Sequence, residues 1–398
     1  MAQQHREMTT DTDTRPGPGQ GPAGDALTAY LQDRATDFLR SLRLHREAST
    51  DAQGAEEALE AARSLRRAAR RIGGTLHTFR PLLDAEWSAS LRPELAWLSG
   101  TLAQEHAYAT RLERLLEALH RLSGVPEAPL PATAPRAAAV AAVSAGPGTP
   151  AGRRSAGSPS RPAGHWGRNG WAQPQSPSQP QNAVPGSRDE SAAPRGLAVG
   201  AAKAAALLER QLTLARTRAH STALQALGSS RFHAVADHVA VLASEVPFSG
   251  ATDDLERLAA AAGANLAEAV AVLPLGQAGH PYNAGALVHG LAADAAPDAQ
   301  DAPWLKVRSL LRLHRYAQEV VLGHASPEPR LADAGHALNV HREAASAAAA
   351  AAHAARTPRI APATAYALGV LHADQRHDVE AARFAFQQAW LREEVRAQ

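Results

Sequence analysis

Apolar residues recur at helical spacing along two long stretches of the chain, residues 25–122 and 196–398. Both stretches are rich in Ala, Leu, Arg and Glu and poor in β-branched residues, and their breaks are short and fall at glycine, proline or serine. No stretch shows the apolar–polar alternation of a half-buried strand. The pattern predicts an all-α protein.

The remaining segments have too little apolar area to offset the entropy lost on ordering. Residues 125–195 are dense in Pro, Ala, Ser, Gly and Gln, and residues 1–24 are polar and aperiodic. We therefore expect two helical bundles of about four or more helices each, joined by a long flexible linker. The predicted division is a disordered tail (1–24), a first bundle (25–124), a disordered linker (125–195) and a second bundle (196–398).

One amphipathic helix, predicted over residues 56–80, concentrates positive charge. On a helical wheel its five central arginines share a face about 140° wide, opposite a stripe that includes Leu65, Ile72 and Leu76. Like charges at this spacing repel one another. For a helix considered alone, a solvated face would be the ordinary interpretation. The five arginines are Arg63, Arg66, Arg67, Arg70 and Arg71.

A second helix, predicted over residues 301–323, repeats this arrangement. Asp301 is expected as its N-cap, Pro303 in its first turn and Gly323 at its end. Its arginines also gather on one face, opposite aliphatic residues. These arginines are Arg308, Arg312 and Arg315.

The two basic helices indicate an internal duplication. Arg66 and Arg70 recur at Arg308 and Arg312 with the same displacement along the chain. Two such faces lining one groove would form a site for a multivalent anion. Arginine suits this role because its guanidinium donates paired hydrogen bonds to phosphate oxygens and keeps its charge when crowded.

The net charge of the chain indicates less about its function than the clustering of the arginines does. Lys and Arg total 41 against 39 acids, a net charge of +2, and lysine occurs only at Lys203 and Lys306. GC-rich codon usage explains an excess of arginine over lysine, so the positions of the arginines carry the information. Cysteine is absent, which excludes disulfides, thiolate catalysis and thiolate metal sites. With no apolar signal region and no long uncharged apolar run, we expect a cytoplasmic protein that does not cross a membrane.

Metal and catalytic motifs are missing from the sequence. The 18 histidines include pairs five residues apart, such as His233/His238 and His336/His341, which point in different directions on a helix. There is no HExxH and no phosphate-binding P-loop motif. We therefore expect no metal site, no cofactor and no catalytic residue.

Two segments resemble a known family. RSLRRAARRIGGTLHTFRPLLDAEW (63–87) and WLKVRSLLRLHRYAQEVV (304–321) resemble the two halves of the CHAD domain, the conserved histidine α-helical domain. The similarity extends over residues 26–122 and 197–395. Positions that match the family motifs are Arg66, Arg70, Arg71, Leu76, Phe79, Arg80 and Pro81 in the first half, and Arg308, Arg312, Arg315, Tyr316 and Glu319 in the second.

This chain departs from the family pattern at several of its motif positions. Arg63 and Leu305 stand where the two family histidines are expected, and Gly73 and Leu313 replace arginines. Arg63 keeps a cation in place, whereas Gly73, Gly74 and Leu313 are expected to lower affinity. Adjacent glycines inside a helix also cost about 1 kcal/mol each relative to alanine, unless a close helix approach requires them.

The resemblance implies two four-helix bundles whose basic central groove binds inorganic polyphosphate without enzymatic activity, in the cytoplasm and in association with polyphosphate granules. Its predicted contacts are Arg63, Arg66, Arg67, Arg70, Arg71, Arg308, Arg312, His314 and Arg315.

Nucleic acid is the alternative partner, because charge alone does not separate a phosphoanhydride from a phosphodiester polymer. Binders of single-stranded nucleic acid usually add exposed aromatic residues for stacking. Aromatic residues make up only 4% of this chain, and Tyr316 is the one beside the basic faces. Trp166 and Trp171 fall in the predicted linker, near further arginines.

Overall fold

The computed structural model describes residues 22–50, 54–123, 192–251, 254–280, 284–291, 297–323 and 328–391. Nearly all of these residues are helical and none belongs to a strand, although one isolated β-bridge joins Leu83 and Phe248. The all-α prediction is confirmed. Most of the predicted tail (1–24) and linker (125–195) lies outside the described residues, but residues 22–24 and 192–195 belong to helices.

The described helices form one compact unit, apart from the first two residues of α4. They are α1 (Pro22–Thr50), α2 (Ala55–Thr78), α3 (Ala85–Ser123), α4 (Ala192–Leu227), α5 (Ser230–Ser244), α6 (Leu255–Ala271), α7 (Leu275–Ala278), α8 (Ala284–Leu291), α9 (Pro297–Leu322), α10 (Pro329–Ala355) and α11 (Pro362–Leu391), with a 3-10 turn, η1 (Arg80–Leu82), after α2.

Several helix ends follow from local chemistry. The Ser229 side chain accepts a hydrogen bond from the backbone N–H of Phe232 at the start of α5, and Asp254 caps α6 in the same way. Pro329 occupies the first turn of α10, where its missing N–H costs nothing. Gly323, with φ of +63°, follows the last residue of α9 in a backbone conformation that side chains disfavour.

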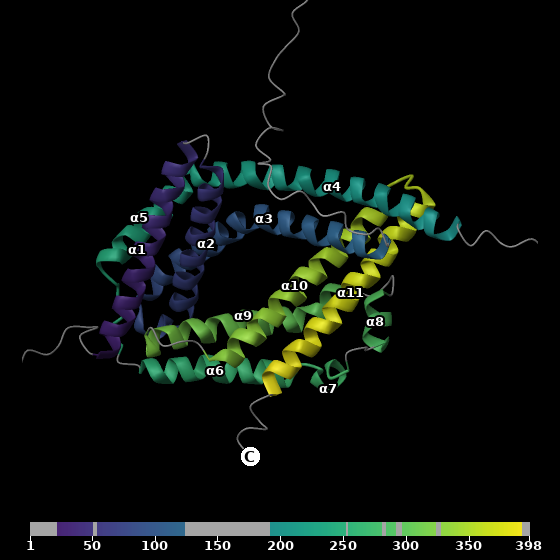
Figure 1. Cartoon of the computed structure of the whole chain (residues 1–398). Helices are drawn as coiled ribbons and strands as arrows, with labels where there is room; N and C mark the ends of the chain where they lie inside the picture. The colour runs from purple at the N-terminus through teal and green to yellow at the C-terminus, as the bar shows by residue number, and fades with distance from the viewer. Residues whose placement is uncertain are drawn as a thin grey trace, which may run out of the picture. The chain divides into compact units, whose positions relative to one another are not determined.

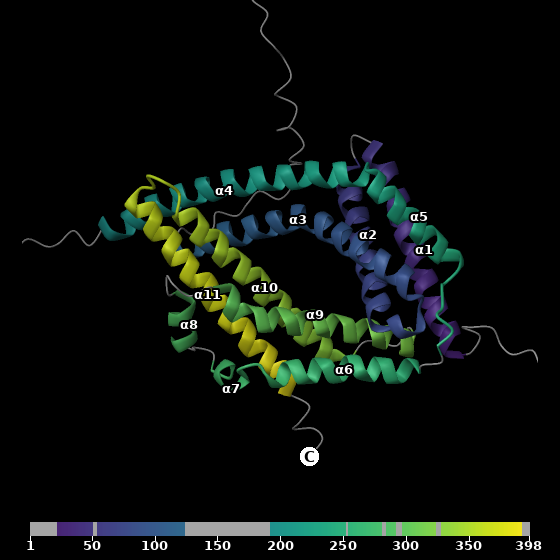
Figure 2. The same ribbon diagram turned by 180° about the vertical axis from the view of Figure 1, so that it is seen from behind.

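One bundle consists of α1, α2, α5 and the N-terminal half of α3, which share one apolar core. In Figures 1 and 2, α1, α2 and α5 lie side by side. The stripe predicted on α2 is buried in this core, where Leu65, Ile72 and Leu76 are all inaccessible to solvent. Phe38 of α1 and Phe232 of α5 pack in the same core. The fourth helix therefore comes from the second stretch of the sequence, so this bundle extends beyond the expected segment 25–124.

A second bundle consists of α6, α9, α10 and α11, with Trp304, Leu311 and Phe386 in its core. A third apolar cluster joins the C-terminal end of α3 to α4 and to the ends of α10 and α11 that meet at their connecting turn. Along the part of the chain that the structure describes, no helix is long and apolar enough to cross a membrane.

A close crossing of α2 and α9 connects the two bundles. A Cβ atom added to Gly74 would lie 2.6 Å from Cδ2 of Tyr316, so only glycine allows this approach. Gly73 is different, because a Cβ there would meet Leu95 at an ordinary 3.7 Å. The helix approach thus requires one of the two adjacent glycines.

Asp301 has another role than the predicted N-cap. Because α9 begins at Pro297, Asp301 lies inside the helix, 5% exposed. Its carboxylate accepts hydrogen bonds from Arg376 at 2.7 Å and Arg383 at 2.6 Å, both on α11. The cap prediction is wrong because the helix extends one turn further toward its N-terminus, and the carboxylate instead joins α9 to α11.

Candidate anion-binding groove

A groove of about 620 Å³ lies among α2, α3, α9 and α10, which are labelled in Figure 1. Its wall on α2 and α3 is built mainly of small residues, among them Gly73, Gly74 and Gly100. No carboxylate is among the described residues that line it. Its six arginines are Arg66 and Arg70 of α2, Arg92 of α3, Arg308 and Arg312 of α9, and Arg342 of α10.

The arginines of this groove repel one another across the α2–α9 crossing. Burial, followed by the charge of Arg70, lowers the pKa of Arg66 to about 10. Burial, followed by the charge of Arg312, lowers the pKa of Arg308 to about 9. Burial and the charge of Arg70 also lower the pKa of Arg312. Arginine remains charged at neutral pH, so this crowding produces a strongly positive potential inside the groove.

Neutral partners hold the guanidinium groups and leave their charge uncompensated. Arg308 donates to Oδ1 of Asn339 at 2.8 Å, and Arg312 donates to Oγ of Ser309 at 3.1 Å. Among the six, only Arg342 has a carboxylate partner within the described parts of the chain, Glu343 at 3.1 Å.

Arg92 is held in a similar way at one end of the groove. Its guanidinium donates to Nδ1 of His77 at 2.8 Å. Burial, followed by the charge of Arg92, lowers the pKa of His77. A neutral imidazole can accept this hydrogen bond, so Arg92 keeps its full charge.

Comparison with known proteins identifies the family. A model of the CHAD domain matches residues 33–338, more than half of the chain. This chain belongs to the CHAD-domain family. Among solved structures it is similar to PptA from Streptomyces chartreusis, at 53% sequence identity and a TM-score of 0.67, with 94% of this chain and 100% of that chain covered. No curated protein sequence matches it.

The structure brings four of the nine residues predicted from the CHAD resemblance into the groove. They are the duplicated pairs, Arg66 with Arg70 and Arg308 with Arg312. The two CHAD motif helices therefore face a common space.

The other arginines of α2 point elsewhere, although they share its basic face. Arg63 and Arg67 both pair with Glu60, at 3.3 Å and 2.8 Å. Arg71 donates two hydrogen bonds to Glu319, at 2.9 Å and 3.4 Å, and Glu319 also accepts one from the hydroxyl of Tyr30 at 2.8 Å. Arg71 thus ties α2 to α9 and α1.

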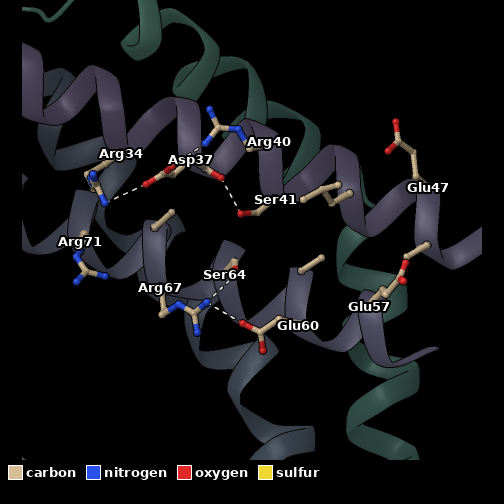
Figure 3. A pocket seen from close by; sticks show the side chains of 14 residues that line it. Arg34, Asp37, Arg40, Ser41, Glu47, Glu57, Glu60, Ser64, Arg67 and Arg71 are labelled. Atoms are coloured by element: carbon tan, nitrogen blue, oxygen red, sulfur yellow. Dashed lines mark hydrogen bonds and ion pairs between the residues drawn. The ribbon is translucent and has the colours of Figure 1, made fainter. Parts of the chain in front are cut away.

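Arg67 and Arg71 line a different cavity, of about 720 Å³ between α1 and α2 (Figure 3). Asp37 pairs there with Arg34 at 2.9 Å and Arg40 at 3.2 Å. Four arginines and four carboxylates line this cavity, so its charges balance. It is the larger of the two spaces, but it lacks the uncompensated cations of the groove.

His314 and Arg315 lie on other sides of α9. His314 packs against α6, where a Cβ on Gly263 would lie 3.0 Å from its Cε1 atom, and burial lowers its pKa. Arg315 is directed toward α10, where a Cβ atom added to Gly335 would lie 3.6 Å from the Nη1 atom of Arg315. Neither residue lines the groove.

Two groove arginines, Arg92 and Arg342, were missed by the sequence analysis. Arg92 precedes Pro93, a residue that usually marks a helix break, yet α3 continues through this proline. Arg342 has no arginine neighbour on its helix that would mark a basic face. No other arginine lies within three turns of either residue on its own helix, so no local pattern could have revealed it.

Proposed function

We propose that this CHAD-domain protein binds inorganic polyphosphate in the groove among α2, α3, α9 and α10, and does so without chemical turnover. The observation that carries the proposal is a set of six arginines, from both duplicated halves, with no carboxylate among the described lining residues. The proposed contacts are Arg66, Arg70, Arg92, Arg308, Arg312 and Arg342. An association with cytoplasmic polyphosphate granules follows from the family resemblance.

The chemistry of the groove matches a linear polyanion. Each internal phosphate of polyphosphate carries a charge, and a guanidinium donates two parallel hydrogen bonds to its oxygens. Burial is the first cause of the lowered pKa values of Arg66 and Arg308, and repulsion between the arginines is the second; binding would relieve this repulsion. A single orthophosphate engages only one or two guanidinium groups, so it should compete poorly.

Nucleic acid is the less favoured partner, because the groove offers charge but little surface for base stacking. Tyr316 is the aromatic residue of its described lining, besides the imidazole of His77. The Tyr316 ring packs against Gly74 and lies under the guanidinium of Arg71, 5.7 Å from ring centroid to Cζ. The ring is therefore already engaged on α2, whereas stacking on bases requires a free aromatic face.

Charge reversals on α2 and α9 test whether both halves form one site. We expect Arg70→Glu and Arg312→Glu each to weaken polyphosphate binding by at least about 1.5 kcal/mol, the scale of one charge-assisted hydrogen bond. The matched control is Arg67→Glu, one turn from Arg70 on the same helix but outside the groove. Circular dichroism would check that each variant remains helical.

Titration calorimetry would measure these affinities, with DNA and RNA as competitors at physiological salt. If Arg67→Glu and Arg70→Glu weaken binding equally, the groove is not the site. If Arg312→Glu has no effect, the site belongs to α2 alone. Tighter binding of nucleic acid than of polyphosphate would favour the alternative partner. Affinity should also fall log-linearly with salt, by roughly 0.7–0.9 in slope for each phosphate contact by analogy with nucleic acids.

A further inference from the structure

A smaller hollow continues the groove between α3 and α10. Its volume is about 50 Å³, and it shares Arg66, Ala103 and Arg342 with the groove. A water molecule occupies roughly 30 Å³ in the liquid, so the hollow has room for one small tetrahedral group. Its other lining residues are His106, Ala107, Thr110, Arg111, Arg114, Glu343 and Ser346.

Arg111 is a cation of this hollow that lacks a counter-charge. No described residue forms an ion pair or a hydrogen bond with it, and its Nε atom is buried without a partner. The guanidinium lies 5.2 Å from the ring centroid of Tyr108, which positions it without neutralising it. Burial, together with the charge of Arg342, lowers its pKa.

Arg114, Arg342 and Glu343 of the hollow are already paired, whereas Arg66 has no ion-pair partner among the described residues. Arg114 donates to Asp378 at 2.6 Å and to the side chain of Gln375. Glu343 pairs with Arg342 at 3.1 Å and is the carboxylate of this lining. Arg66 and Arg342, at the junction with the groove, also have buried Nε atoms without a hydrogen-bond partner in the described regions. Both arginines at the junction therefore keep unused hydrogen-bond donors.

We propose that the hollow around Arg111 is a second phosphate subsite, joined to the groove through Arg66 and Arg342, so that the protein distinguishes linear polyphosphates by their length. This inference rests on the proposed function. Arg92 lies toward one end of the groove and Arg111 lies in the hollow, and both belong to α3. At roughly 1.5 Å per residue they are about 28 Å apart along the helix axis.

A chain long enough to reach both positions gains the second contact as an intramolecular event, which raises affinity beyond that of either contact alone. A short oligophosphate held in the groove gains nothing from Arg111. The subsite therefore appears in experiment as a dependence of affinity on chain length.

The test compares tripolyphosphate with long-chain polyphosphate on the full-length protein. Arg111→Gln should lower affinity for the long chain by about tenfold, the size of one charge-assisted contact, and leave tripolyphosphate affinity unchanged. Glu343→Gln removes the carboxylate of the hollow and should raise long-chain affinity. The control is Arg121→Gln, also on α3 but exposed and paired with Glu117 and Asp374, which should change neither affinity.

Arg66→Gln separates this inference from the proposed function. Because Arg66 lines both spaces, its loss should weaken binding of both ligands. If the unmodified protein binds neither ligand, or Arg66→Gln has no effect, the proposed function fails. If polyphosphate binds but Arg111→Gln changes both affinities equally, or neither, the second subsite is refuted. If Arg111→Gln loses helicity, the affinity of Glu343→Gln for the long chain tests the subsite instead. If Glu343→Gln binds long-chain polyphosphate as tightly as the parent or less tightly, the subsite is refuted.

Discussion

The crowding of arginines predicts that the groove has a cost in stability. Arg312→Met removes one charge from this cluster while keeping most of the aliphatic stem and a similar helix propensity. Arg312 experiences the charges of Arg70 and Arg342, and its hydrogen bond is to Ser309, one turn earlier on the same helix. We therefore expect the variant to be more stable than the parent and to bind polyphosphate less tightly.

The magnitude follows from these contacts. Each like-charge pair at a partly exposed site contributes about 0.2–1 kcal/mol of repulsion, and loss of the Ser309 hydrogen bond costs about 0.5–1.5 kcal/mol. The variant also avoids the cost of removing the Arg312 guanidinium from water, since burial is the largest cause of its lowered pKa. We expect a net stabilisation of about 1 kcal/mol, which raises Tm by about 2–4 °C in a domain of this size.

Scanning calorimetry with and without long-chain polyphosphate would measure both effects. The ligand should raise the Tm of the parent by more than that of Arg312→Met, because its affinity for the variant is lower. Arg67→Met is the control, since Arg67 pairs with Glu60 outside the groove. We expect Arg67→Met to be less stable than the parent by up to about 1 kcal/mol and to bind polyphosphate with unchanged affinity. A fall in Tm for Arg312→Met, with unchanged affinity, would refute the reasoning.

Two further predictions concern the scaffold. Gly74→Ala should destabilise the protein, because the added Cβ would lie 2.6 Å from the ring of Tyr316 across the helix crossing. Gly73→Ala meets only an ordinary contact and should stabilise the protein by up to about 1 kcal/mol. Urea unfolding of both variants would measure the two changes in stability. Burial raises the pKa of Asp301, but hydrogen bonds from His341 and Arg376 outweigh it and bring the pKa to about 2. Because the folded-state pKa is depressed, this stabilisation is complete above about pH 4 and is lost as the pH falls toward 2. The difference in unfolding free energy between the parent and Asp301→Asn should therefore shrink over that interval, and a constant difference would contradict the prediction.

Local sequence determined the helices and the two basic faces. Helical periodicity placed Leu65, Ile72 and Leu76 on the buried side of α2 because burial of an apolar stripe depends on spacing that is visible within a few turns. The equal displacement of Arg66/Arg70 and Arg308/Arg312 indicated the duplication, and these four arginines line one groove. The family was identifiable for the same reason, since its motifs lie within single helices.

Only the tertiary structure decided which neighbouring helix each side of a given helix faces. The basic face of α2 is wide enough to border two neighbours, so Arg66 and Arg70 face the groove while Arg67 and Arg71 face the cavity beside α1. Arg342 joins the site from a helix distant in sequence, where it stands as an isolated cation. Gly74, an apparent defect by helix propensity, is required by the crossing with α9. Periodicity along one helix sets which side is apolar, but only long-range packing sets what each polar side chain meets.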